Sequence, residues 1–174
     1  MIPDPSGFGP VTSSLVVGPE GEHIGPDGTS RSLGGEADFE WFVSLRRQAK
    51  VILTSGKTFR DEKYRKPESA ELAVFSRSAS DIIPNFEVIR IGPQAAQSFS
   101  DAVGHLLSLG FDRIHCEFGP TGFVSLAKTQ SIASLLSSES LNGIESFTTK
   151  HSLKFDLLGS NALSIARVGS VAVH

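Results

Sequence analysis

The residues with the clearest chemical potential are Ser55-Gly56-Lys57-Thr58, which follow the apolar run Val51-Ile52-Leu53. A glycine lets backbone N–H groups approach an anion closely, while the threonine adds a hydroxyl donor and the lysine a positive charge. The segment therefore predicts a phosphate-binding turn between a buried strand and a helix. The alternative is an ordinary tight turn. The spacing is not that of a Walker loop, which has a longer glycine-bounded span before its lysine.

A second segment of this kind is Gly119-Pro120-Thr121-Gly122, at the end of the apolar stretch RIHCEF. It also predicts a strand that ends in a glycine turn and opens a helix, which is a geometry that receives anions. Glu117, just before this turn, is an ionisable side chain that could meet a ring nitrogen or an amide. The alternative is a surface carboxylate beside a helix cap.

The third segment is Ser76-Arg77-Ser78, after the apolar stretch ELAVF. Two hydroxyls and a guanidinium suit a phosphate monoester, such as the 2′-phosphate that distinguishes NADP. Similar triplets are common in solvated loops. Ligands of open α/β sheets bind outside the carboxyl ends of the strands. One extended dinucleotide would therefore explain all three segments together.

Metal and thiol chemistry have little support in the sequence. No two of the five histidines have the i, i+4 spacing of a helical metal site, so we expect no metal. The single cysteine, Cys116, excludes an intramolecular disulfide and a cysteine-rich zinc site. No base for a Cys116 nucleophile is evident. His115 is more typical of a packed or edge-exposed side chain than of a catalytic one.

These segments need a sheet to position them. Hydrophobic patterning and turn signals predict strands at 11–18, 51–55, 71–75, 86–91 and 113–118. They predict helices at 38–49, 94–109 and 123–128, the first capped by Asp38 and the second ended by Gly110. Further strands are predicted at 131–137, 152–158 and 162–173, with no strong helix between them. The expected fold is α/β, with a central mixed, mostly parallel sheet and an antiparallel C-terminal edge.

Length and charge limit the protein class. The 174 residues suit one domain, which we place at 11–174 after a flexible lead-in at 1–10. A formal charge of −3 provides no basic field for nucleic acid. No apolar run approaches the roughly 20 residues that span a membrane, and the N-terminus lacks the pattern of a signal peptide. We therefore expect a cytoplasmic protein that binds neither nucleic acid nor membrane.

Four stretches together resemble the reductase domain of bacterial riboflavin biosynthesis, which has a dihydrofolate-reductase-like three-layer fold. They are GTSRSLGGEAD, SLRRQAKVILTSGKTFRDEKY, LAVFSRS and CEFGPTG. The chain is most similar to the stand-alone actinobacterial type, which has a similar spacing of Thr58, Arg60, Glu62 and Tyr64. The resemblance implies that NADPH reduces the pyrimidine ribosyl phosphate 5-amino-6-(5-phosphoribosylamino)uracil to its ribitylamino form. A separate deaminase would act first, because the sequence has no deaminase zinc signature.

The resemblance also implies roles for individual residues. Cofactor contacts fall on Thr58, Glu62 (or its neighbour Asp61), Ser76, Gly119, Pro120, Thr121 and Gly122, and the residue chemistry described above adds Gly56 and Arg77. Substrate contacts fall on Ser30, Arg46 and Glu117. The expected assembly is a homodimer, because the predicted C-terminal strands form a sheet edge that could pair across a dimer.

Two positions depart from the family pattern. The family has an acid after its first Ser-Leu pair, where this chain has Val16, and Phe118 separates Glu117 from Gly119. A bulky ring at Phe118 could narrow the nicotinamide pocket. The alternatives are a related pterin or dihydrofolate-type reductase, or a non-catalytic NADP(H)-binding homologue without the acid.

Overall fold

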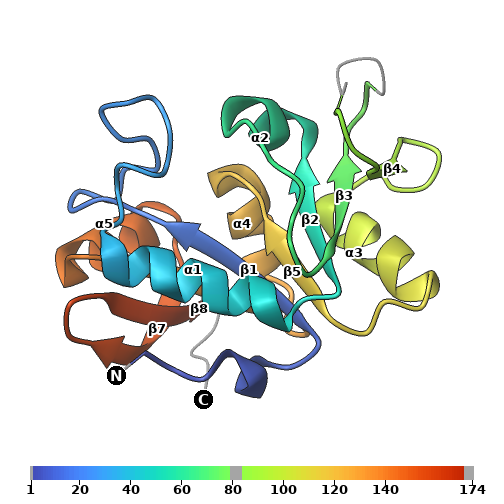
Figure 1. The fold of residues 1–174 in the computed structure, drawn as a ribbon. Coiled ribbons are helices and arrows are strands. Elements are labelled where there is room, and N and C mark those ends of the chain that lie inside the picture. The colour runs from blue at the N-terminus through green and yellow to red at the C-terminus, as the bar shows by residue number, and fades with distance from the viewer. Residues whose placement is uncertain (1, 79–83, 171–174) are drawn as a thin grey trace.

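The computed structural model describes residues 2–78 and 84–170, and these form one eight-stranded sheet flanked by helices (Figure 1). The strand order is β4-β3-β2-β5-β1-β6-β8-β7. The strands are β1 (Val11–Val16), β2 (Val51–Ser55), β3 (Glu71–Phe75), β4 (Ile89–Ile91), β5 (Ile114–Glu117), β6 (Ala133–Ser138), β7 (Lys154–Ser160) and β8 (Ser164–Gly169). The helices are the 3-10 helix η1 (Pro5–Phe8), α1 (Glu36–Gln48), α2 (Gly56–Asp61), α3 (Phe99–Ser108), α4 (Pro120–Ala127) and α5 (Leu141–Lys150).

The sheet has the predicted mixture of strand directions. Strands β1 to β6 all run parallel to one another, whereas β8 pairs antiparallel with both β6 and β7. The parallel strands are covered on both faces, so β2 and β3 are almost wholly buried. The α/β fold class and the antiparallel C-terminal edge are thus confirmed.

Helices form a layer on each face of the sheet (Figure 1). On one face α3 and α4 pack on a core that includes Leu53, Cys116 and Phe118, and α5 packs on a second core around Leu136. On the other face Trp41 and Leu45 of α1 contact Leu135 and Ile165. Successive residues of a strand therefore point alternately towards α1 and towards the α3–α4 layer. Only side chains that point to the same face can share a site.

One α-helix of the described residues was not predicted. Helix α5 lies between β6 and β7, where the sequence analysis predicted no strong helix. Gly143 and two threonines lower its intrinsic helix propensity. The helical spacing of the apolar residues Ile144 and Phe147 was therefore not recognised as a helix. A Cβ atom at Gly143 would lie 2.2 Å from the carbonyl oxygen of Gly18, so close packing requires this unfavourable residue.

Several boundaries also differ from the prediction. Helix α1 begins after Gly35 and contains Asp38 within its first turn, so Asp38 is not the N-cap. Helix α3 begins at Phe99, because Ser98 and Asp101 form a capping box, and Gly110 takes the predicted left-handed conformation. Strand β4 is limited to three residues. Positions 171–173 of the last predicted strand lie outside the described residues.

The N-terminal segment contacts the body of the protein. Phe8, at the end of η1, lies edge-on to Trp41 of α1 with ring centroids 6.3 Å apart. No helix within residues 2–78 or 84–170 has the length and apolar character needed to cross a bilayer.

Candidate functional site

The three glycine- and hydroxyl-rich turns lie side by side at one edge of the sheet. They follow β3, β2 and β5, which are consecutive in the strand order and parallel. Their carboxyl ends therefore meet at the same edge, which is where open α/β sheets bind ligands. The tertiary structure brings together segments that span residues 55 to 122.

The turn after β2 is built by Ser55. Its Oγ accepts a hydrogen bond of 3.1 Å from the Thr58 backbone N–H and caps α2. The same hydroxyl donates to Thr58 Oγ1 at 3.0 Å, which fixes the Thr58 side chain. Lys57 is exposed and pairs with Asp61 one helical turn later. The positive charge of Lys57 is therefore paired with the Asp61 carboxylate at the surface.

The turn after β5 lies against the first one. Gly119 is the N-cap of α4 and Pro120 is its first residue, a position where proline fits because no intrahelical N–H is required. A Cβ atom at Gly119 would lie 3.9 Å from Thr58 Oγ1. Since glycine leaves that space empty, the two turns form a continuous polar surface, and Thr121 is exposed beside it.

Gly122 has a packing role in the structure. A Cβ atom there would lie 2.6 Å from Cβ of Phe118, so the first turn of α4 can lie on this ring only if the residue is glycine. The Phe118 ring is itself buried against Phe99, with centroids 4.6 Å apart. Phe118 belongs to the core under α3 and α4, so it does not narrow a pocket on the α1 face.

Ser76, in the turn after β3, lies next to Gly56 in the turn after β2. A Cβ atom at Gly56 would lie 2.8 Å from Ser76 Oγ, which places these two residues in direct proximity. Ser76 Oγ also accepts from the Ser78 N–H at 3.2 Å and donates to the Ser78 carbonyl at 3.0 Å. Arg77 is exposed at this end of the sheet. The structure therefore places Ser76 within the same polar surface.

At the centre of the sheet edge, Glu117 and Arg46 are paired. Nε and Nη2 of Arg46 donate to the two carboxylate oxygens of Glu117 at 2.7 Å each. Glu117 is 6% exposed and the Arg46 side chain 26%. Burial alone would lower the pKa of Arg46, but the hydrogen bond and charge of Glu117 outweigh burial and raise it. Arg46 and Glu117 were both predicted to contact the substrate, and in the structure they are hydrogen-bonded to each other.

Tyr64 completes this cluster. Its hydroxyl donates a short hydrogen bond to Glu117 Oε2, and its ring stacks on Phe59. Burial raises the pKa of Tyr64 well above its ordinary value, so the phenol remains a donor at neutral pH. Thr54 donates to the backbone carbonyl of Glu117 at 2.7 Å and fixes the strand end. From the sequence, Tyr64 contributed only to the spacing that carries the resemblance, and no role was predicted for it.

A buried histidine lies two residues before Glu117 in β5, on the same face of the sheet. His115 is 1% exposed, and Thr12 Oγ1 lies 2.8 Å from its Nδ1 while Ser14 Oγ lies 3.1 Å from its Nε2. Its Nε2 is 3.8 Å from Glu117 Oε1. Burial lowers the pKa of His115 to about 4, so the ring is neutral at pH 7. Of the two non-catalytic alternatives considered for His115, packed or edge-exposed, the structure shows the packed one.

A second acid reaches the end of β1 from helix α1. Ser137 of β6 is the strand partner of Val16, and its Oγ donates to Asp38 Oδ1 at 2.7 Å. Burial raises the pKa of Asp38, with a smaller opposing effect from the Ser137 hydrogen bond. Although β1 carries Val16 where the family pattern has an acid, a carboxyl group is therefore supplied to this region by α1.

Glu62 contacts the long loop 19–35. Its Oε1 accepts from the Ser30 backbone N–H at 3.0 Å, and its carbonyl accepts from Arg31 Nη2 at 3.1 Å. The loop leaves the sheet on the same side as α2 (Figure 1). A hydrogen bond therefore joins Ser30 and Glu62. Ser30 was predicted to contact the substrate and Glu62 the cofactor.

Some residues of this site were detectable in the sequence. Thr12 and Ser14 alternate in one predicted strand, and His115 and Glu117 alternate in another. Alternation in a buried strand places both members of a pair on one face. Polar residues at alternate positions of two core strands could therefore have indicated a buried polar site. Asp38 had no such signal, because it was assigned to the helix cap.

Within the part of the chain that the structure describes, no group of three or more His, Cys, Asp or Glu side chains could hold a metal ion. Cys116 is fully buried, and burial raises the pKa of its thiol, so the nucleophilic thiolate is disfavoured.

Solved structures share this fold. A pyrimidine reductase-like protein from Corynebacterium diphtheriae superposes with a TM-score of 0.66 at 16% identity, covering 92% of each chain. A diaminohydroxyphosphoribosylaminopyrimidine deaminase/5-amino-6-(5-phosphoribosylamino)uracil reductase from Thermotoga maritima gives 0.60 at 14% identity, covering 93% of this chain and 57% of the other. Dihydrofolate reductase from Schistosoma mansoni gives 0.56 at 15% identity, covering 92% and 97%.

These structures confirm the dihydrofolate-reductase-like fold and the structural resemblance to riboflavin-pathway reductases, including a stand-alone protein. No family model matches the sequence. No curated protein sequence matches it either.

Proposed function

We propose that the protein is an NADPH-dependent reductase of the riboflavin pathway type. Its substrate would be 5-amino-6-(5-phosphoribosylamino)uracil and its product the ribitylamino form. The observation that carries this proposal is the junction of two polar regions at the end of β5. The turns after β3, β2 and β5 form one surface, and the Arg46–Glu117–Tyr64 cluster begins where that surface ends.

The residues present fit a dinucleotide. The space that a Cβ atom would fill at Gly119 faces Thr58 Oγ1, so backbone and hydroxyl donors are available together. The turn backbone at Gly119–Thr121 and the Thr58 hydroxyl would hold the diphosphate, while Ser76 and Arg77 would hold the 2′-phosphate. When bound, the cofactor supplies the hydride.

The substrate would lie on the α1 face. A guanidinium has five N–H groups and Glu117 uses two, so Arg46 keeps donors for the phosphate of the substrate. Ser30 would be placed beside it by Glu62. Asp38, held by Ser137, would accept hydrogen bonds from the pyrimidine and so take the place of the acid absent at Val16.

The proposal is tested by mixing purified protein with NADPH and the deaminated pyrimidine ribosyl phosphate and following the nicotinamide absorbance. We expect oxidation of NADPH that requires the pyrimidine. Arg46→Ala should weaken substrate affinity while NADPH affinity stays near that of the wild type, and Arg47→Ala, on the exposed side of the same helix turn, is the matched control. If NADPH does not bind, the proposal fails.

Two other results would redirect the assignment. Binding of NADPH without turnover of this substrate, but with turnover of a dihydropterin, would favour a pterin-type reductase. Binding without any turnover would favour a non-catalytic NADP(H)-binding protein, in which the closed Arg46–Glu117 pair is structural. The homodimer stays a prediction, which sedimentation equilibrium would test.

A further inference from the structure

Two buried polar side chains, Thr12 and His115, and the half-buried Ser14 form a continuous hydrogen-bonded series along the centre of the sheet. Thr12 Oγ1 is 2.8 Å from His115 Nδ1, and His115 Nε2 is 3.1 Å from Ser14 Oγ. Thr12 and Ser14 are two residues apart in β1, on the face that carries α1, and His115 lies on the neighbouring strand β5. The series therefore runs along the sheet from its amino end towards its carboxyl end.

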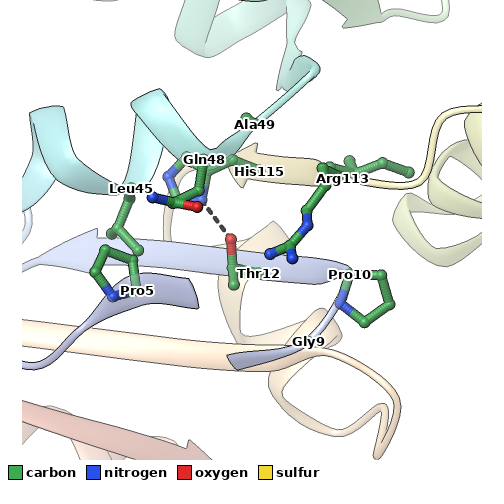
Figure 2. A pocket seen from close by; sticks show the side chains of 10 residues that line it. Pro5, Gly9, Pro10, Thr12, Leu45, Gln48, Ala49, Arg113 and His115 are labelled. Carbon is green, nitrogen blue, oxygen red and sulfur yellow. Dashed lines mark hydrogen bonds between the residues drawn. The ribbon is translucent and has the colours of Figure 1, made fainter. Parts of the chain in front are cut away.

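The amino end of the series opens into a pocket. Thr12 and His115 line it, together with Gln48, Arg113 and the exposed residues Gly9 and Pro10 (Figure 2). Its volume of about 10 Å³ lies near the minimum of roughly 10–15 Å³ that holds a water molecule. This pocket is at the opposite end of the strands from the three turns and the Glu117 cluster.

The carboxyl end of the series reaches the candidate site. Ser14 is half-buried and follows Ser13, which pairs with Cys116, so Ser14 comes level with Glu117 on the next strand. His115 Nε2, which contacts Ser14, is 3.8 Å from Glu117 Oε1. The side chains of Ser14, Glu117 and Arg46 thus belong to the same small region under α1.

We propose that Thr12, His115 and Ser14 form a proton path that carries a proton from the amino-end pocket to the substrate at the carboxyl end. This inference rests on the proposed function, because each reduction by hydride also consumes one proton. Bound cofactor and substrate would cover the carboxyl edge, whereas the pocket on the opposite side stays open to water.

The geometry allows every bond in the series to point the same way. Thr12 Oγ1–H donates to His115 Nδ1, His115 Nε2–H donates to Ser14 Oγ, and Ser14 Oγ–H donates to the acceptor atom of the substrate. Transfer along the series moves one proton from each group to the next. A pocket water gives its proton to Thr12, and the hydroxide left behind is neutralised by a proton from the solvent. The imidazole is left protonated at Nδ1. After product release, exchange with water in the open site restores the Nε2–H tautomer.

The surroundings of His115 fit a relay that works through tautomers. Burial keeps the ring neutral, so one nitrogen is a donor and the other an acceptor, as the series requires. Glu117 and Arg46, the charged groups that influence the ring, act in opposite directions on its pKa. An isolated buried polar cluster contributes little net stability, and apolar side chains of similar size would fill the sheet as well.

The test uses two substitutions at the pocket end. Thr12→Val preserves side-chain shape but removes the hydroxyl, and Thr12→Ser preserves the hydroxyl. In single-turnover reactions we expect Thr12→Val to slow NADPH oxidation by about tenfold or more, because proton transfer by positioned groups contributes on the order of 10²–10⁴-fold. Thr12→Ser should stay within about twofold, and its solvent deuterium isotope effect should match that of the wild type. NADPH affinity should be equal in all three proteins.

A second readout does not depend on activity. Exchange of the His115 ring N–H with water can be followed by NMR in Ser14→Ala, where the carboxyl end of the path is cut. Adding Thr12→Val should then slow this exchange by about tenfold. Ser14→Ala also tests the path if Thr12→Val does not fold, since it should slow single turnover as well.

The outcomes separate the two proposals. If the wild type oxidises NADPH and Thr12→Val reacts as fast as Thr12→Ser, the proton path is overturned and the reductase assignment stands. If the wild type never oxidises NADPH with any of the substrates, the reductase assignment fails. The exchange rate of the His115 N–H then decides the path alone, and equal rates with and without the Thr12 hydroxyl would overturn it.

Discussion

The guanidinium of Arg46 and the carboxylate of Glu117 face each other through two hydrogen bonds of 2.7 Å, although 71 positions separate them in the sequence. The pair is bidentate, which is the strongest common geometry for these groups. It fixes the C-terminal turn of α1 over the end of β5. A substrate phosphate would therefore meet an arginine whose orientation is already set.

Breaking this pair should destabilise the fold. Arg46→Met removes the cation and leaves Glu117, which is 6% exposed, with Tyr64 as a neutral partner. We expect the free energy of unfolding to fall by about 3 kcal/mol, the lower part of the range for a broken buried pair, because Arg46 is partly exposed. Urea denaturation measures this loss.

A double-mutant cycle isolates the pair itself. Arg46→Met combined with Glu117→Leu should cost less than the sum of the two single substitutions, with a coupling energy of about 1–3 kcal/mol. Arg47→Met is the control, since Arg47 is exposed in the same turn of α1. Additive single effects would show that the two side chains do not support each other in solution.

Filling the space at Gly119 should weaken cofactor binding without harming the fold. A Cβ atom there meets only Thr58 Oγ1, at 3.9 Å, and the backbone conformation suits any residue. Gly119→Ala should therefore keep the thermal unfolding midpoint within a few degrees of the wild-type value. NADPH affinity, measured by calorimetric titration, should fall by about tenfold because the backbone is screened from phosphate.

The matched control for this substitution is Gly104→Ala. Gly104 lies within α3 and a Cβ atom there contacts nothing within 4 Å. Alanine should stabilise the helix by up to about 1 kcal/mol and leave NADPH affinity unchanged. A Gly119→Ala protein that binds NADPH as tightly as Gly104→Ala would contradict the placement of the diphosphate at this turn.

The buried His115 should make stability depend on pH in a defined window. Its pKa in the folded protein is about 4, below its ordinary value of 6.5, because burial disfavours the charged ring. A depressed pKa means that the unfolded chain binds the proton first, so the contribution is fully present above pH 6.5. It is lost as the pH falls from 6.5 towards 4, by on the order of 3 kcal/mol.

The measurement compares wild type with His115→Leu by urea denaturation at several pH values. The difference in unfolding free energy between the two proteins should change across this window and stay constant above pH 7. Glu117 and Arg46 are present in both proteins, so their effect largely cancels. A difference that is independent of pH would mean that the ring is not buried in its neutral form.

The contact between Glu62 and Ser30 should hold the long loop against α2. Glu62→Ala removes the acceptor of the Ser30 N–H, so this amide should exchange with solvent at least about tenfold faster in hydrogen exchange followed by NMR. Glu68→Ala, on the segment before β3, is a surface control and should leave the Ser30 exchange rate unchanged. If Ser30 exchanges equally fast in both variants, the contact does not order the loop.

The order of the elements around the site was predictable because the chain carries strong local signals there. Residues 51–53 and 72–75 are apolar runs between turn residues, and the strands that contain them match the predicted bounds. The glycine turn at 119–122 marks the start of α4 in the same way. Such signals depend only on neighbouring residues. The sequence therefore determined the α/β fold and the candidate anion-binding turns.

The pairing within the site was decided by the tertiary structure alone. Strand order places β5 between β2 and β1, which brings Glu117 to Arg46 and His115 to both Thr12 and Ser14. Helix α5 was not predicted because Gly143 lowers its helix propensity. This glycine is required by the close contact with Gly18, which only the folded structure reveals. These relationships depend on which strands become neighbours, and no local pattern in the chain encodes that choice.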